Sequence, residues 1–232
     1  MNKFWNFSTG EAGRELYLNG PISDVTWFGD EITPAAFREE LAAGDGDITV
    51  WINSPGGCVF AAAEIYTALR EYTGRVTVKI NGMCASAASV VAMAGAEVLM
   101  SPVSYMVIHN PATVAIGDSE EMLRAKATLD EIKEGIINAY EAKTKLPRAE
   151  ISRLMNEESC FNAKKAVQLG FADDVLYDNQ SVNDSAPVIF SRMSVMNSLL
   201  AKIPQPVKQA DPAPGIYDEL DELEARLNKL KQ

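Results

Sequence analysis

Hydrophobic and polar positions change their period along this chain, and the changes mark out strands and helices. Runs of β-branched and apolar residues predict three strands, over residues 14–19, 47–53 and 76–81. Apolar positions at helical spacing predict one helix that begins at Thr33-Pro34 and another over residues 59–72. This alternation of strand, loop and helix is typical of right-handed βαβ units around a parallel sheet.

The most apolar stretch of the chain, residues 83–100, follows the third strand. It is rich in Ala and Ser and is interrupted by Gly95 and Glu97. We therefore interpret it as a buried helix followed by a short strand rather than as a membrane span. Gly82 is expected to end the strand before this stretch. Short strands are expected near residues 97–100 and 105–109.

From Asp118 onward the pattern changes to long helical runs. One helix is predicted from Asp118 to about residue 143. It is longer than a crossover between strands requires, so we expect it to project from the sheet and to pack on another element. Three further elements are predicted: a helix over residues 147–156, a short helix over 163–169 stopped by Gly170, and a strand over 175–177.

The last quarter of the chain has a different composition. Residues 179–215 are rich in Pro, Ser, Asn and Ala, which is typical of a linker. In residues 216–232, apolar residues recur at spacings of 4, 3, 4 and 3, which predicts a short amphipathic, coiled-coil-like helix. The sequence therefore divides into a globular domain over residues 1–178, a linker over 179–215 and a C-terminal helix over 216–232.

Charge and residue counts exclude several classes of function. The formal net charge of −11 argues against a nucleic-acid partner held through phosphate contacts and against adhesion to an anionic membrane surface. The N-terminus has no basic-then-apolar run, so no signal peptide is expected. The three cysteines form no CxxC pair, which favours buried thiols in a reducing compartment. With one histidine, His109, no multi-histidine metal site is expected, and we expect neither a metal nor a cofactor.

Two loops at the expected carboxyl ends of the strands carry candidate chemistry. Residues 54–57 (Ser-Pro-Gly-Gly) let the backbone approach a ligand closely, although such a turn is by itself a weak signal. Residues 82–89 place Ser86 at the start of a small-residue helix, where it is either an N-cap or a nucleophile. His109 ends an apolar strand at the same edge. A hydroxyl, an imidazole and backbone amides are what acyl transfer requires.

Three motifs occur in an order that resembles the proteolytic subunit of the Clp protease, ClpP: residues 53–57, residues 82–86 and residues 106–111. The 29 residues from Gly57 to Ser86 fit the spacing in that family, and the resemblance covers roughly residues 14–178. It implies an α/β fold of the ClpP/crotonase type, built from repeated ββα units with a long projecting helix. It also implies a serine peptidase with Ser86 as nucleophile and His109 as base.

The third member of the triad is where this sequence departs from the family pattern. The family usually carries Asp shortly before a segment that corresponds here to residues 160–170. Counting back from Ala163 puts Glu158 at this position. Glutamate can act as aspartate does if the backbone lies about one methylene further away. Glu157 is the competing choice.

The resemblance also bears on the nucleophile and on the backbone donors. Ser89 lies one helical turn after Ser86 and fits the nucleophile position less well, because the Ala94-Gly95 pair then follows too closely. The implied donors to the oxyanion are the backbone amides of Gly57 and Ala87.

By the same resemblance we expect a ring-shaped homo-oligomer, heptameric and either single or stacked as a double ring through the long helix. Its substrates would be proteins or peptides. Glu158 and the additional C-terminal segment are most similar to phage and prophage ClpP-related proteases. This similarity indicates a head-maturation protease that acts on capsid and scaffold proteins, in the cytoplasm of a bacterial host or inside the prohead.

The sequence leaves other functions open. A general ClpP-type degradative subunit would work with a separate unfoldase ATPase, because the chain has no P-loop. A crotonase-type acyl-CoA enzyme shares the fold and the use of backbone amides for an oxyanion. A non-catalytic ring or scaffold subunit would assemble without cleaving anything. A membrane-linked signal-peptide peptidase would need a Ser-Lys pair and an anchoring segment, and we expect no membrane contact.

Overall fold

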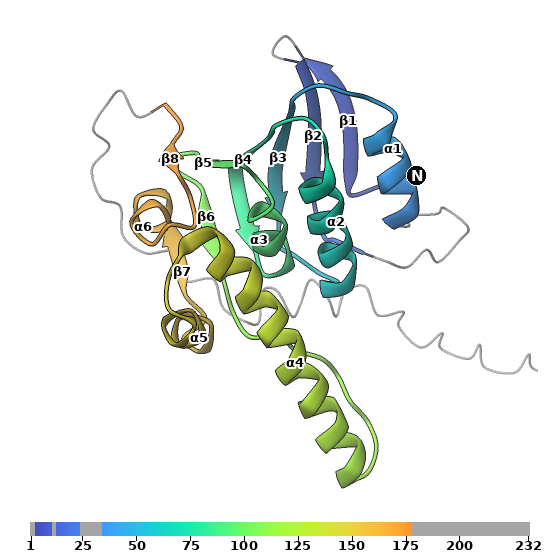
Figure 1. Cartoon of the computed structure of the whole chain (residues 1–232). Coiled ribbons are helices and arrows are strands. Elements are labelled where there is room, and N and C mark those ends of the chain that lie inside the picture. The colour runs from blue at the N-terminus through green and yellow to red at the C-terminus, as the bar shows by residue number, and fades with distance from the viewer. Residues whose placement is uncertain (1–2, 11–12, 24–33, 178–232) are drawn as a thin grey trace, which may run out of the picture. The chain divides into compact units, whose positions relative to one another are not determined.

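The fold was obtained as a computed structural model, which describes residues 3–10, 13–23 and 34–177 (Figure 1). The described part is a mixed α/β structure with one sheet and several helices, which confirms the predicted fold class. The predicted linker over 179–215 and the predicted helix over 216–232 lie outside the described residues, as does the proposed N-cap Thr33.

The described strands join in a single sheet. Six of them correspond to predicted runs: β2 (Gly13–Asn19), β3 (Ile48–Ser54), β4 (Val76–Ala85), β5 (Glu97–Met100), β6 (Tyr105–Val107) and β8 (Asp174–Val175). The sequence pattern does not indicate the other two, β1 (Trp5–Gly10) and β7 (Cys160–Asn162). The strand order is β1-β2-β3-β4-β5-β8, and β6 pairs with both β4 and β7.

The sheet is mixed, which corrects the expectation of a parallel sheet. The strands that follow long connections pair in parallel, as β2–β3, β3–β4, β4–β5, β4–β6 and β5–β8. β1 is antiparallel to β2, and β7 is antiparallel to β6. Two residues separate β1 from β2, and neighbouring strands joined by so short a connection must be antiparallel.

The helices lie close to the predicted positions. Their bounds are α1 (Pro34–Ala42), α2 (Val59–Glu71), α3 (Ala87–Ala92), α4 (Ser119–Thr144), α5 (Arg148–Asn156) and α6 (Ala163–Gln168). The start of the longest helix, α4, has a clear physical cause. The Asp118 carboxylate accepts hydrogen bonds from the amides of Glu120 and Glu121, at 3.0 and 3.1 Å. This cap begins α4 at the position where the sequence predicted the helix to start.

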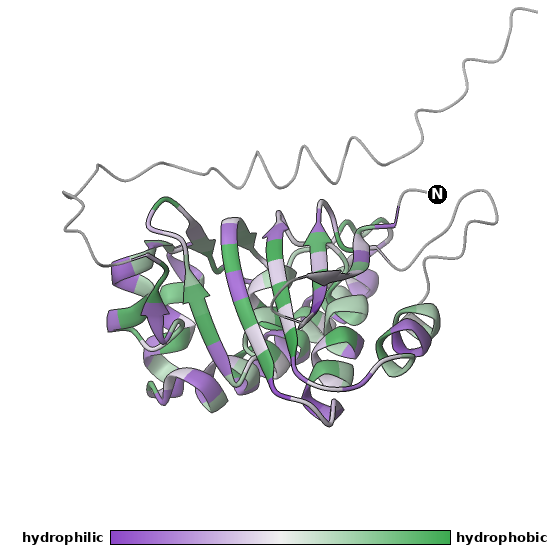
Figure 2. Ribbon diagram, turned by 90° about the horizontal axis from the view of Figure 1, so that it is seen from above, coloured by the Kyte–Doolittle hydropathy of each residue, from purple (hydrophilic) through white to green (hydrophobic). Residues whose placement is uncertain are grey.

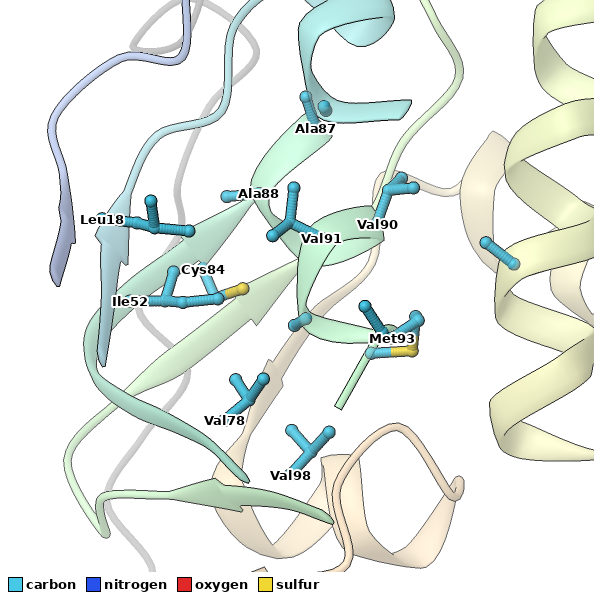
Figure 3. Close-up of a cluster of buried hydrophobic side chains, with 14 of the residues drawn as sticks. Leu18, Ile52, Val78, Cys84, Ala87, Ala88, Val90, Val91, Met93 and Val98 are labelled. Atoms are coloured by element: carbon cyan, nitrogen blue, oxygen red, sulfur yellow. The ribbon is translucent and has the colours of Figure 1, made fainter. Parts of the chain in front are cut away.

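One face of the sheet carries the hydrophobic core. Along β3, Ile48, Val50 and Ile52 are at most 2% exposed, whereas Thr49 and Trp51 between them are partly exposed. The same alternation of hydropathy is visible along the strands in Figure 2. Figure 3 shows side chains of α3, among them Val91, beside Ile52 and Cys84 of the strands. The core therefore anchors α3 and the turn that precedes it.

Gly82 does not end β4 as predicted, and the strand runs on to Ala85. A register shift in its pairing with β3 accommodates the extra residues. At the shift, the side-chain oxygen of Asn53 accepts a hydrogen bond from the Met83 amide at 3.1 Å, in place of a backbone partner. The longer strand places Ser86 directly at the end of β4.

The helix α4 projects from the rest of the fold, as predicted (Figure 1). The C-terminal half of α4 packs against α3 and α5. All the buried residues of α4 lie in this half: Ile136, Ile137, Ala139 and Tyr140. In the N-terminal half, Met122 and Leu123 are 40% and 60% exposed. Within the described ranges, no helix combines the length and the hydropathy that a membrane span requires.

Candidate active site

Ser86 occupies a strained turn between β4 and α3, called here the Ser86 turn. Its backbone has φ 54° and ψ −127°, a conformation that residues other than glycine rarely adopt. Ser86 stands at the N-cap position of α3, but its side chain makes no capping hydrogen bond. The N-cap interpretation therefore does not explain this serine. A strained strand-to-helix turn is the geometry by which a nucleophile elbow exposes its hydroxyl.

Hydrogen bonds on both sides hold the Ser86 turn in place. The Ser86 amide donates to the Val107 carbonyl of β6 at 2.8 Å. The Ser86 carbonyl accepts two hydrogen bonds from Ser89, one from its amide at 2.9 Å and one from its hydroxyl at 2.5 Å. Strained conformations persist where their surroundings over-determine them, and Ser86 is such a case.

The Gly56-Gly57 turn lies directly against the Ser86 turn. A Cβ atom on Gly56 would come within 2.5 Å of the Ala85 carbonyl oxygen and within 2.7 Å of Ser86 Cβ. Gly56 also has φ of 88°, which a side chain disfavours. The structure thus brings the two loops predicted to carry chemistry into contact, and the contact requires glycine.

The backbone amides of Gly57 and Ala87, which the family resemblance implies as donors to the oxyanion, lie in these two adjoining turns. The Ile22 amide donates to the Gly56 carbonyl at 2.8 Å, and the Cys58 amide donates to the Ile22 carbonyl at 2.9 Å. In such parallel pairing the residue in between, Gly57, directs its own amide away from the partner. Ala87 is the first residue of α3, so its amide has no acceptor within the helix.

His109 follows β6 at the same end of the sheet as Ser86. The parallel pairing of β4 with β6 aligns Ala85 with Val107, so the two strands end side by side. His109 Nδ1 lies 2.6 Å from the Asn110 carbonyl oxygen. His109 Nε2 is buried and has no hydrogen-bond partner in the part of the chain that is described. The strands therefore place the imidazole near the Ser86 turn, but no hydrogen bond joins it to the hydroxyl.

The antiparallel pairing of β6 with β7 distinguishes the two candidate acids. Beyond the last paired residues, the Ile108 amide donates to the Ser159 carbonyl at 3.0 Å. Continued one residue past this hydrogen bond, the register would set His109 opposite Glu158, which itself belongs to the turn that ends α5. Glu158 directly precedes Ser159, so it is one residue closer than Glu157 to the His109 end of this ladder.

Glu157 has a different environment. It is exposed, and each of its carboxylate oxygens accepts a hydrogen bond from the Arg153 guanidinium at 2.6 Å. Glu158 is only partly exposed, and its φ of 50° is that of a left-handed residue just after the end of α5. The engagement of Glu157 with Arg153 favours Glu158 over Glu157, and the catalytic role of Glu158 stays a prediction.

The hydrogen bonds of a working triad are not formed in this structure. His109 Nδ1 faces a main-chain carbonyl, and the side chain of Asn110 donates to Asn156 Oδ1 at 3.0 Å. Asn156 Oδ1 also accepts from Lys133 of α4 at 2.8 Å. Catalytic hydrogen bonds are often misaligned in enzymes without substrate and tighten on binding. The pairing of β4 with β6 thus places Ser86 and His109 at one edge of the sheet, while His109 Nδ1 contacts the Asn110 carbonyl and Nε2 has no partner among the described residues.

Ser89, the other serine weighed as nucleophile, has a structural role. It is fully buried. Its hydroxyl oxygen lies 2.8 Å from the Tyr140 hydroxyl oxygen, and its hydroxyl donates a hydrogen bond to the Ser86 carbonyl. Sequence reasoning did not single out Tyr140, Asn110 or Asn156. For Tyr140 a signal was present, because a phenol on the apolar face of a helix requires a hydrogen-bond partner when it is buried.

Two of the three cysteines, Cys84 and Cys160, are poor candidates for a nucleophile. No described cysteine forms a disulfide, and Cys84 is fully buried. Burial raises the pKa of the Cys84 thiol and of the Cys160 thiol, which disfavours the reactive thiolate. Over the described ranges, no three His, Cys, Asp or Glu side chains gather closely enough to hold a metal ion.

A comparison with models of known protein families matches residues 14–179 to the family described as Clp protease. The match covers more than half of the chain and includes Gly57, Ser86, His109 and Glu158. Proteins of this family are serine peptidases that act on protein substrates and generally form oligomeric rings. The chain therefore belongs to the Clp protease family.

Proposed function

We propose that this chain is a serine endopeptidase that cleaves peptide bonds through Ser86, His109 and Glu158. The observation that carries the proposal is the strained Ser86 turn, which packs against Gly56 at the edge of the sheet where β6 leads into His109. An acyl-CoA enzyme of the crotonase type needs backbone amides but no strained serine. The turn therefore favours the peptidase over that alternative.

In the proposed reaction, Ser86 Oγ attacks the carbonyl carbon of the scissile peptide while His109 Nε2 accepts the hydroxyl proton. The Glu158 carboxylate accepts a hydrogen bond from His109 Nδ1–H and stabilises the imidazolium. The amides of Gly57 and Ala87 donate to the tetrahedral oxyanion. The imidazolium then protonates the leaving amine, which departs as the acyl-enzyme forms. Water hydrolyses the ester after giving a proton to His109.

This reaction requires the imidazole to leave the Asn110 carbonyl. Rotation of the ring would turn Nδ1–H toward Glu158 and Nε2 toward the Ser86 hydroxyl. A buried ring nitrogen without a partner is unfavourable, and His109 Nε2 is in that state. The rotation therefore exchanges one contact with a carbonyl for two hydrogen bonds, and bound substrate would favour it further.

We propose further that the chain forms heptameric rings and that two rings stack through the free end of α4. Apolar side chains gather in that region: Val114 is 69% exposed, Ile116 92% and Leu123 60%. Exposed apolar groups on a projecting element are typical of an interaction surface. Stacked rings would enclose the active sites and admit only unfolded or small substrates. Folded substrates would then require an unfoldase ATPase as partner.

The biological role that we propose is maturation of a phage or prophage capsid, with capsid and scaffold proteins as substrates. Two features support it. Glu158 stands where the family usually has Asp, and residues 180–232 lie beyond the family match. The proposed location is the cytoplasm of a bacterial host and, during assembly, the inside of the prohead. A general degradative subunit that works with an ATPase is the alternative.

A fluorophosphonate probe tests the peptidase proposal, because it reacts with a base-activated serine. We expect labelling of the wild type at Ser86, none in Ser86→Ala, and unchanged labelling in Ser119→Ala, a control at an exposed serine of α4. A folded wild type that does not react would contradict the proposal. Thioester hydrolysis that survives in Ser86→Ala would indicate an acyl-CoA enzyme. Rings that neither react nor cleave would indicate a scaffold subunit.

Mass spectrometry of the purified chain tests the maturation role. We expect the wild type and Ser119→Ala to be shortened within residues 179–215, whereas Ser86→Ala stays intact. The comparison separates self-processing from cleavage by a host protease, which would shorten all three proteins. An intact wild type would count against self-processing and favour the degradative alternative.

A further inference from the structure

A line of buried hydrogen bonds runs from α4 to the peptide unit that follows Ser86. Tyr140 of α4 is 1% exposed and Ser89 of α3 is 0% exposed. Their hydroxyl oxygens lie 2.8 Å apart, and the Ser89 hydroxyl lies 2.5 Å from the Ser86 carbonyl oxygen. We call this pair of hydrogen bonds the Tyr140–Ser89 relay. The triad chemistry described above does not use it.

The direction of the relay follows from the number of protons available. A serine hydroxyl has one proton to donate, and a carbonyl oxygen can only accept. Ser89 Oγ therefore donates its proton to the Ser86 carbonyl, and Tyr140 must donate to Ser89 Oγ. Burial raises the pKa of the Tyr140 phenol, so the phenol keeps its proton at neutral pH.

The relay ends on the amide that is assigned to the oxyanion. The Ser86 carbonyl and the Ala87 amide belong to one peptide unit, and the described part of the chain has no cis peptide bond. In a planar trans peptide, the C=O and N–H bonds point in opposite directions. Hydrogen bonds that fix the Ser86 carbonyl therefore also fix the direction of the Ala87 N–H. A hydrogen bond accepted at the carbonyl also polarises the peptide and strengthens its N–H as a donor.

We propose that Ser89 and Tyr140 are positioning residues for the oxyanion hole, which orient and polarise the Ala87 amide through the Ser86 carbonyl. The inference rests on the proposed function, because it takes the Ala87 amide as an oxyanion donor. It explains why a serine so near the nucleophile is wholly buried. It also explains why a phenol interrupts the apolar face of α4 at Tyr140.

Steady-state hydrolysis of a peptide substrate by the full chain tests the relay. Polarisation strengthens a hydrogen bond by a modest fraction, so Tyr140→Phe is expected to lower kcat about twofold. Ser89→Ala removes the hydroxyl hydrogen bond from the Ser86 carbonyl and leaves only the one from the Ser89 amide, so it is expected to lower kcat about tenfold. KM should not change in either variant, because the oxyanion forms only in the transition state. Tyr66→Phe, at a half-buried tyrosine of α2, is the matched control and should keep kcat.

The double variant separates positioning from packing. Ser89→Ala leaves the buried Tyr140 hydroxyl without its acceptor, so the midpoint of denaturant unfolding should fall. Adding Tyr140→Phe removes the orphaned hydroxyl and should restore much of the midpoint. The kcat of the double variant should nevertheless stay at that of Ser89→Ala, because Tyr140 acts only through Ser89. If kcat recovers together with stability, the pair is structural and the proposal is overturned.

The proton chemical shift of the Ala87 amide, measured with 15N-alanine label, gives a readout that does not depend on turnover. We expect it to move in Tyr140→Phe and in Ser89→Ala but not in Tyr66→Phe. Two outcomes separate the relay from the proposed function. If the wild type reacts with a fluorophosphonate at Ser86 but neither kcat nor the Ala87 shift changes in the variants, the relay is overturned and the peptidase function stands.

If the wild type does not react, the proposed function is overturned. The Ala87 shift in the variants then shows whether the hydrogen bonds of the relay polarise the Ala87 amide.

Discussion

The two sides of the candidate site differ in how completely their hydrogen bonds are formed. On the Ser86 side, the Ser86 amide and carbonyl are both bonded, and Gly56 packs against the turn. On the His109 side, His109 Nε2 and Asn110 Oδ1 are both buried without a partner in the described part of the chain. The imidazole there contacts the carbonyl of its own loop.

The difference reflects the elements that build each side. The Ser86 turn rests on β4, α3 and the buried half of α4, which belong to the hydrophobic core. His109 lies in the loop after β6, and the contacts of that loop lead to the exposed side chain of Asn156. The core thus fixes the Ser86 turn, which holds the proposed nucleophile and the Ala87 amide proposed for the oxyanion. The proposed base, His109, is not held by a comparable set of hydrogen bonds.

The largest effect is expected from His109→Ala. The chain has no second histidine to replace the base, so kcat/KM should fall by about a millionfold. Stability should change little, because the imidazole has a buried nitrogen that is not hydrogen-bonded. Peptide hydrolysis and denaturant unfolding measure the two effects. Appreciable turnover by a folded His109→Ala protein would refute the triad.

Glu158→Gln should have the second-largest effect. A neutral amide cannot stabilise the imidazolium, and in other serine peptidases the equivalent change lowers kcat about ten-thousandfold. Glu157→Gln is the matched control and should keep most of the activity, because Glu157 is an exposed partner of Arg153. If Glu157→Gln is inactive and Glu158→Gln is fully active, Glu157 is the third member of the triad.

Gly56→Ala tests the preorganised side. The new Cβ would clash with the Ala85 carbonyl and Ser86 Cβ, so we expect a loss of about 3 kcal/mol in unfolding free energy. Displacement of the Ser86 turn should lower kcat about a hundredfold. Gly135→Ala is the control, because a Cβ there meets open space in α4 and should stabilise the helix by about 1 kcal/mol. Near-normal activity of Gly56→Ala would show that the turn is not held as tightly as its contacts indicate.

The smallest effect is expected from Asn156→Ala, which removes the partner of the Asn110 side chain. Asn156 is exposed, so stability should change by no more than about 0.5 kcal/mol. The imidazole must in any case leave this loop, and kcat should change less than about threefold. A fall in kcat comparable to that of Gly56→Ala would mean that the His109 side is as preorganised as the Ser86 side.

Local sequence determined most of the elements and the candidate nucleophile and base. Helical spacing marked α2 and α4, β-branched runs marked β3 and β4, and small residues with adjacent glycines marked the loops around Ser86. These signals are local, because they depend on side-chain period and on the conformations that glycine permits. The short strands β1 and β7 have no such period, and the sequence did not indicate them.

Only the tertiary structure decided how these parts work together. The position of the segment after Glu158 beside β6 depends on the register of β6 with β7. The extension of β4 past Gly82 depends on an Asn53 side chain from another strand. The Tyr140–Ser89 relay joins residues 51 positions apart in the chain. Each of these is a pairing between distant segments, which no local pattern specifies because it forms only when the core brings those segments together.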